Sequence, residues 1–279
     1  MKNFLKRYAR NYGAVVGLVI LFIVTILALF APILYDYSPW KMVGVPLIPP
    51  FTDFTYPLGT DMLGRDIMAG IVWGARVSLL VGVVSTSVSL LFGVCVGSVA
   101  GFYGGIVDDA LMRFTELFQT IPQFPLAIVL VAILGPSLYS IMIAIAIVSW
   151  PPAARLVRGE FLTLRQREFV HASVVIGQRP WRTISSQILP NAMSPIVVSA
   201  SFMVATAILT EAALSFLGLG DRNMMSWGFM IGAARTMIRQ AWWMSVWPGI
   251  AILLTVLAIN LIGEGLSDAL NPHLRKHNE

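Results

Sequence analysis

The sequence predicts an all-α membrane protein that crosses a bilayer about six times. Of its 279 residues, 57% are hydrophobic and only 12% are charged, about half the charged share of an average soluble domain. Two apolar stretches, 12–34 and 77–102, contain no charged residue, and each is longer than the roughly 20 residues that span the hydrocarbon core. Because lipid offers peptide groups no hydrogen-bond partner, such stretches cross it as helices.

The other spans follow from shorter apolar runs and from the turns between them. The third span should be interrupted, because Pro122 and Pro125 lack a backbone N–H and break a helix. Gly135, Pro136 and Ser137 are typical of a turn before the fourth span. The six expected spans are 12–34, 77–102, 111–134, 138–154, 195–216 and 241–262.

Lysine and arginine predict the orientation of these spans. If the N-terminus lies inside, 13 of the 19 basic residues lie on the cytoplasmic side and six lie outside, which is the bias of the positive-inside rule. Trp242, Trp243 and Trp247 are expected at the outer membrane interface, where aromatic residues collect. The first apolar run is too long for a signal peptide and lacks a convincing cleavage site, so it is expected to stay as a span.

This orientation divides the chain into parts with different surroundings. We expect a cytoplasmic N-terminus at 1–11, a first transmembrane helix at 12–34, an external segment at 35–76, a core of five transmembrane helices at 77–267 and a cytoplasmic tail at 268–279. The core includes a cytoplasmic loop at 155–190. A shorter external stretch, 217–240, is expected to include a brief amphipathic helix.

The basic cytoplasmic loop is the most informative part of the chain. Its middle has the pattern of a short helix, Glu168 to Ile176, flanked by arginines. Gly177 permits a turn after this helix, and Pro180 suits the first turn of the next one. Such a helix either docks in a groove of a partner protein or lies on anionic lipid, and the residues alone favour neither.

Glycines in the second span predict a close helix contact. Gly93, Gly97, Gly101 and Gly105 are spaced by four, so they form one stripe where another helix can approach. We expect that helix to belong to this chain, with a helix of another subunit as the alternative.

The ionisable residues of the spans lie near span ends. Glu116, Glu211 and Glu264 are expected to cap helices or to pair inside the bundle, because a proton relay would place acids nearer the bilayer midplane. His273 and His277 are too few for a metal site and are expected in a solvated tail. The chain has no GxxxxGK[ST] phosphate loop, so it is not expected to be an ATPase or another enzyme.

One motif of the cytoplasmic loop resembles that of a known family. The stretch from Phe169 to Ser173 is followed by Gly177 and then by Leu189-Pro190. This pattern is similar to the "EAA…G…LP" loop through which bacterial ABC-importer permeases contact their ATPase. His171 replaces the usual leading acid, and Ser173 replaces the second alanine. The resemblance implies that ATPase coupling is carried by Glu168, His171, Ala172, Ser173, Gly177, Leu189 and Pro190.

Three further stretches extend the resemblance over nearly the whole chain. Residues 57–79, 211–220 and 260–274 are similar to signatures of the dipeptide, oligopeptide and nickel branch, in its shorter, C-type subunit. This implies a type I ABC-importer permease fold in a bacterial inner membrane. It also implies a second, homologous permease, two cytoplasmic ATPases that bind ATP and Mg²⁺, and an extracytoplasmic binding protein. This chain itself would bind no cofactor.

Alternatives remain for both substrate and class. Di- or oligopeptides are the broadest expectation, and nickel or another metal chelate and glutathione stay open. A proton-driven secondary transporter or channel would need midplane acids or paired half-helices, and a membrane enzyme would need clustered His, Asp or Glu. Nucleic-acid binding is not expected, because the positive charge gathers beside the spans, next to membrane lipid.

Overall fold

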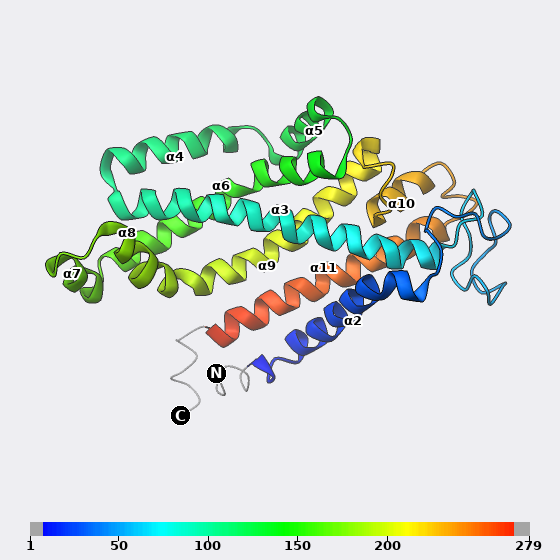
Figure 1. Ribbon diagram of the computed structural model, residues 1–279, viewed down its shortest axis with the longest axis horizontal. Coiled ribbons are helices and arrows are strands. Elements are labelled where there is room, and N and C mark those ends of the chain that lie inside the picture. Colours follow the sequence, from blue (N-terminus) through cyan, green and yellow to red (C-terminus); the bar gives the residue numbers. More distant parts are fainter. Residues whose placement is uncertain (1–7, 271–279) are drawn as a thin grey trace.

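The structure is a computed structural model that describes residues 8–270. Within that range it consists of helices without a β-strand, and the long helices run side by side along an elongated bundle (Figure 1). The α-helices are α2 (Tyr12–Leu34), α3 (Ile67–Tyr103), α4 (Gly105–Thr120), α5 (Gln123–Leu134), α6 (Leu138–Arg165), α7 (Glu168–Val175), α8 (Pro180–Thr183), α9 (Leu189–Leu214), α10 (Trp227–Ala234) and α11 (Trp243–Leu270). Two π-helical turns, η1 (Ile184–Ile188) and η2 (Ser215–Leu219), adjoin α9.

The predicted all-α fold with about six spans is confirmed. Five helical stretches are long and apolar enough to cross a membrane, and α4 with α5 forms a further pair that is bent by 83°. The bend follows from proline, since Pro122 precedes α5 and Pro125 lies in its first turn, where proline is tolerated but cannot continue α4. Gly135 has a φ of +84° and Ser137 caps α6, so the predicted turn is also present.

Five helices extend beyond the apolar runs that predicted them. α4 begins at Gly105, α9 begins at Leu189 and α11 ends at Leu270, whereas residues 111, 195 and 262 were expected. The differences are largest for α3 and α6. α3 begins at Ile67 rather than at residue 77, with the Asp66 side chain as its N-cap. α6 continues to Arg165 rather than ending near residue 154. In both helices a charged residue, Arg76 or Arg155, ends the apolar run but not the helix. A charge marks the edge of the lipid, whereas a cap or a turn ends the helix.

The glycine stripe lets α3 lie directly against α6. A Cβ atom at Gly93 or Gly101 would lie 2.7 or 2.6 Å from a side chain of α6, and one at Gly97 would overlap the backbone oxygen of Ala154. The predicted contact within the chain is therefore confirmed for these three glycines. It is wrong for Gly105, which begins α4 and has no neighbour within 4 Å of a Cβ.

A buried carboxyl joins α9 to α10. The Glu211 side chain is 1% exposed, and its Oε1 accepts hydrogen bonds from Ser215 Oγ and Ser226 Oγ, both at 2.7 Å. Pairing inside the bundle is thus confirmed for Glu211, whereas Glu116 and Glu264 are exposed. The brief helix expected in this external stretch is α10, but it is apolar on all sides rather than amphipathic.

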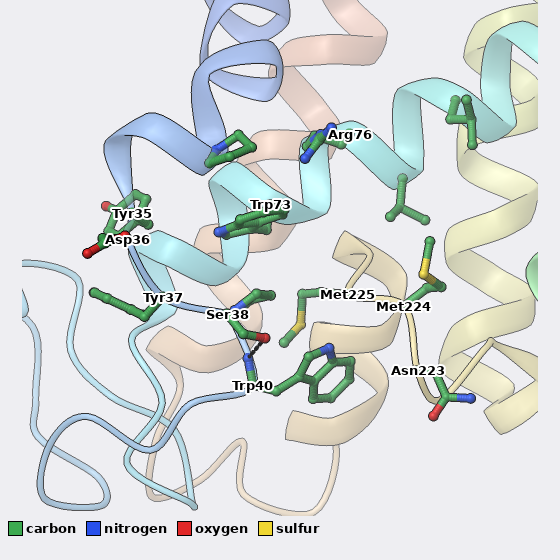
Figure 2. Close-up of a pocket in the computed structure, with 14 residues that line it drawn as sticks. Tyr35, Asp36, Tyr37, Ser38, Trp40, Trp73, Arg76, Asn223, Met224 and Met225 are labelled. Atoms are coloured by element: carbon green, nitrogen blue, oxygen red, sulfur yellow. Dashed lines mark hydrogen bonds between the residues drawn. The ribbon is translucent and has the colours of Figure 1, made fainter.

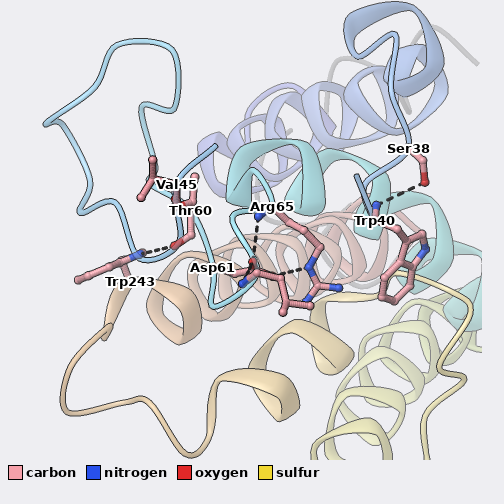
Figure 3. Close-up of polar contacts among 8 residues, drawn as sticks. Ser38, Trp40, Val45, Thr60, Asp61, Arg65 and Trp243 are labelled. Carbon is pink, nitrogen blue, oxygen red and sulfur yellow. Dashed lines mark hydrogen bonds and ion pairs between the residues drawn. The ribbon is translucent and has the colours of Figure 1, made fainter. Parts of the chain in front are cut away.

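The segment between α2 and α3 is compact and is held against α11. Thr60 Oγ1 donates to the backbone oxygen of Val45 at 2.6 Å, and Trp243 Nε1 donates to the backbone oxygen of Thr60 at 3.1 Å (Figure 3). Asp61 and Arg65 form an ion pair of 2.5 Å beside them. The segment therefore has polar bonds of its own and a direct link to the start of α11.

These contacts correct the expected place of one tryptophan. Trp243 is buried under the segment, so its side chain does not face lipid. The Trp247 ring packs against Phe51 with ring centroids 6.1 Å apart, and its interface position stays a prediction. For Trp242, which is 49% exposed, the interface position stays a prediction. The two histidines of the tail, His273 and His277, lie outside the described residues.

Replacing Gly97 with alanine should lower the thermal stability of the chain. The new methyl group would overlap the backbone of α6, and overpacking costs about 1–3 kcal/mol. The matched control is Gly159→Ala in α6, where nothing lies within 4 Å of a Cβ and where alanine favours the helix by roughly 0.5–1 kcal/mol. We expect a lower Tm in detergent for Gly97→Ala alone, and equal values for the two variants would contradict the close packing.

Asp66 should make the stability of the chain depend on pH. Burial raises the pKa of this carboxyl, and hydrogen bonds from the Tyr37 hydroxyl, at 3.0 Å, and from the backbone oppose the shift. The folded chain therefore holds the proton more tightly than the unfolded chain. The resulting stabilisation is complete below the unfolded pKa of about 3.9 and is lost as pH rises through the folded pKa.

Asp66→Asn keeps a side-chain cap but removes the titration. Its Tm should therefore change less than that of the parent between about pH 4 and pH 7. Asp66→Ala also loses the cap and should be less stable by about 0.5–2 kcal/mol. An unaltered pH profile in Asp66→Asn would exclude Asp66 as the titrating group.

Candidate functional site

The short helix α7 lies at one end of the bundle, opposite the segment that joins α2 to α3 (Figure 1). It is one residue shorter than the predicted helix and ends in a Schellman motif. Gly177 has a φ of +77°, and its N–H donates to the Val174 oxygen at 2.9 Å. The N–H of Gln178 donates to the Ser173 oxygen at 3.0 Å. These bonds satisfy the last carbonyls of α7, so the turn predicted at Gly177 is confirmed.

One face of α7 anchors it to the bundle. Val170 is 2% exposed and packs in an apolar cluster with Phe161 of α6 and Ile188 of η1. Ser173, one turn later, is also buried, and its Oγ donates to the Val170 oxygen at 2.7 Å. Leu189, at the start of α9, packs against the same cluster. The helix is therefore seated on both α6 and η1.

The other face of α7 and the adjoining turns present apolar side chains that nothing in the described chain covers. We call this surface the α7 patch; its exposed fractions are 40% for Phe169, 56% for Val174, 85% for Val175, 80% for Ile176 and 64% for Trp181. Adjacent apolar side chains at this level of exposure mark an interaction surface.

Positive charge surrounds the α7 patch. Four exposed arginines flank α7, namely Arg165, Arg167, Arg179 and Arg182. None of them takes part in an ion pair among residues 8–270, where the ion pairs are Arg65–Asp61 and Arg158–Asp108. A partner surface that is apolar at its centre and acidic at its rim would complement this arrangement.

Two arginines of α6 tie α4 to the same end of the bundle. Arg158 contacts both carboxylate oxygens of Asp108, at 2.5 and 2.6 Å, and Arg155 donates to Gln119 at 2.8 Å. The sequence did not predict these pairs, because 50 and 36 residues separate the partners along the chain. They hold α4 against the helix that leads directly into α7.

The structure places the seven predicted coupling residues in two groups. Glu168, His171, Ala172, Ser173 and Gly177 lie on α7 or in its terminal turn, whereas Leu189 and Pro190 begin α9. Glu168, His171 and Ala172 are exposed, but Ser173 faces the bundle and serves to anchor α7. The anchoring role of Val170 and the α7 patch were not predicted from the sequence, although the run Val174-Val175-Ile176 in a basic loop was a usable indication. Among residues 8–270, no three His, Cys, Asp or Glu side chains are grouped to hold a metal ion.

Two family models match the chain. One, described as binding-protein-dependent transport system inner membrane component, matches residues 93–276. The other, described as N-terminal TM domain of oligopeptide transport permease C, matches residues 1–57. Together they match the chain except for residues 58–92 and 277–279.

Several named permeases are similar over almost the full chain. The di/tripeptide transport system permease protein DppC of Pseudomonas aeruginosa (strain UCBPP-PA14) is 41% identical over 99% of this chain and 93% of its own length. The oligopeptide permease OppC of Bacillus subtilis (strain 168) is 39% identical over 99% and 90%. The glutathione permease GsiD of Pectobacterium atrosepticum is 38% identical over 98% and 91%.

A solved structure has the same fold at low sequence identity. An inward-facing form of the MetNI methionine ABC transporter matches with a TM-score of 0.61 and 19% identity, over 74% of this chain and 98% of that chain. The expected ABC-importer permease fold is thereby confirmed.

Gly177→Pro should disorder the turn after α7, whereas Gly177→Asn should preserve it. Proline fixes φ near −65° and has no N–H to donate to Val174. Asparagine adopts the left-handed conformation at modest cost and keeps the N–H. Amide hydrogen exchange across residues 168–178 should accelerate in the proline variant alone. Equal protection in both variants would show that the turn does not depend on Gly177.

Proposed function

The chain belongs to the family of inner-membrane components of binding-protein-dependent transport systems, and we propose that its α7 couples it to an ATPase that drives peptide import. The observation that carries this proposal is the α7 patch, which is exposed, apolar, ringed by arginines and seated on α6. A chain without a phosphate-binding loop needs another subunit to supply ATP hydrolysis.

The proposed assembly contains this chain, a homologous second permease, two cytoplasmic ATPases that bind ATP and Mg²⁺, and an extracytoplasmic binding protein. Both termini and α7 lie in the cytoplasm in this arrangement, as the excess of basic residues on that side favours. The segment between α2 and α3, at the opposite end of the bundle (Figure 1), then faces the binding protein. The complex lies in the bacterial inner membrane.

Coupling would proceed by rigid-body movement. ATP binding closes the ATPase dimer, which displaces the groove that holds the α7 patch and therefore α7 itself. Because Val170 is packed against Phe161 and Ile188, α6 and α9 move with α7. The pathway then opens outward, and hydrolysis returns it to the inward-facing form. His171 and Ala172 are exposed on α7 and would contact the ATPase.

Di- or oligopeptides are the substrate class that we assign. The relatives with the highest identities above carry di/tripeptide and oligopeptide in their names. Glutathione, itself a tripeptide, is the second candidate because the GsiD relative is 38% identical over nearly the full chain. Uptake by the reconstituted complex of a labelled dipeptide, with unlabelled oligopeptide, glutathione and a nickel chelate as competitors, would rank these classes.

Val175→Glu should uncouple the permease from its ATPase. The side chain is 85% exposed, so the change leaves the fold intact, but it places a charge in the centre of the proposed contact, where desolvation is costly. We expect ATPase co-purification to fall and stimulation of ATP hydrolysis by the loaded binding protein to drop at least about tenfold.

The matched control is Gln166→Glu, which adds the same charge at an exposed position next to α7 but outside the α7 patch. It should copurify the ATPase at the parental level. If Val175→Glu retained full copurification and stimulated hydrolysis, α7 would not be the docking element.

A further inference from the structure

A cavity of about 790 Å³ lies at the end of the bundle opposite α7, where α2 meets α3 (Figure 2). Three separate segments form its walls: the end of α2 with the residues that follow it, the first third of α3, and the chain just before α10. Aromatic rings, which include Tyr35, Trp40 and Trp73, line much of the cavity, and Val77 and Leu80 of α3 add an apolar wall.

Arg76 is the cation of this cavity, and its charge is unpaired. Its guanidinium lies over the Trp73 ring, 5.2 Å from the centroid, and the ion pairs among residues 8–270 are formed by Arg65 and Arg158 instead. Asp36 also lines the cavity, but its carboxylate points away from Arg76 (Figure 2). An unpaired guanidinium beside an apolar wall is suited to a ligand with a negative charge.

The position of Arg76 along α3 places this charge at the edge of the membrane. Residues 77–102, which follow it directly, contain no charge, and Pro32 of the apolar α2 lines the same cavity. Trp and Tyr side chains gather at the level of lipid headgroups. The cavity is therefore at headgroup depth, with its apolar wall leading into the hydrocarbon.

A second cavity lies further along α3. Leu80 is 46% exposed and lies one turn from Val84, which with Val88 lines a cavity of about 740 Å³ among α3, α4 and α6. The lining of this cavity is almost wholly apolar side chains, such as Phe92 and Ile147. From Arg76 to Val88 the helix rises about 18 Å, close to the roughly 15 Å of one hydrocarbon leaflet.

We propose that these two cavities together bind one anionic phospholipid. The headgroup phosphate pairs with Arg76 at Trp73, and an acyl chain follows Leu80 and Val84 into the second cavity. A peptide would match the charge of Arg76 but not the second cavity, because its backbone groups would lose their hydrogen bonds there. The site requires only that the chain spans a membrane, so it does not depend on ATPase coupling or on the substrate.

The test is lipid binding to the full-length chain by native mass spectrometry, with phosphatidylglycerol added to protein in detergent. Arg76→Gln should weaken binding of the tightest lipid about tenfold, which is the usual effect of losing a charged hydrogen bond. Arg76→Lys should bind within about threefold of the parent. Arg239→Gln removes an exposed arginine that lies in neither cavity, and it should leave binding unchanged. Equal affinities for Arg76→Gln and Arg239→Gln would overturn the proposal.

Two further measurements distinguish the occupants. Leu80→Trp should fill the space between the two cavities and weaken binding of the long-chain lipid. Unchanged lipid binding in this variant, or full displacement of the lipid by millimolar inorganic phosphate, would show that the site binds a free anion instead. A photo-crosslinking amino acid at position 80, irradiated in native membranes, should give a phospholipid adduct. An adduct with another polypeptide would assign this space to a partner subunit and overturn the lipid site.

Discussion

The close approach of α3 and α6 is the constraint on which the rest of this fold depends. Only glycine allows the backbones to meet at Gly93, Gly97 and Gly101, since a Cβ there would collide with α6. Lipid supplies no hydrophobic force between helices, so van der Waals packing of this kind must hold them together. The two helices form a rigid centre, against which α9 packs on one side and the bent pair α4–α5 on the other (Figure 1).

The sequence predicted the spans well because the physics of a lipid-embedded segment is local. A run of apolar residues is sufficient to predict α2, whose bounds at Tyr12 and Leu34 were expected. Helix ends outside the lipid depend on caps and on tertiary contacts instead. For this reason the start of α3 was predicted too late, next to Arg76, and the end of α6 was predicted too early, next to Arg155. Each arginine ends an apolar run but lies within its helix.

The candidate site shows the same division. The helix α7 and its Gly177 turn follow from local pattern, because a Schellman turn needs only a glycine at one position. The identity of the exposed face does not follow from pattern. Whether Val170 or Val175 is buried depends on Phe161 and Ile188, which lie elsewhere in the chain. The Asp108–Arg158 pair could not be predicted from the sequence either, since each residue taken alone has the pattern of a solvated charge.

The helix α6 is long enough to contact the structure at both ends of the bundle. Its 28 residues give a length of about 42 Å. Near one end the Leu138 N–H donates to Asp221, in the connection between α9 and α10, at 3.1 Å. At the other end two residues separate Arg165 from α7. The glycine stripe prevents α6 from sliding freely past α3. In the coupling proposed above, a displacement of α7 would therefore reach the opposite end of the bundle because both helices move together.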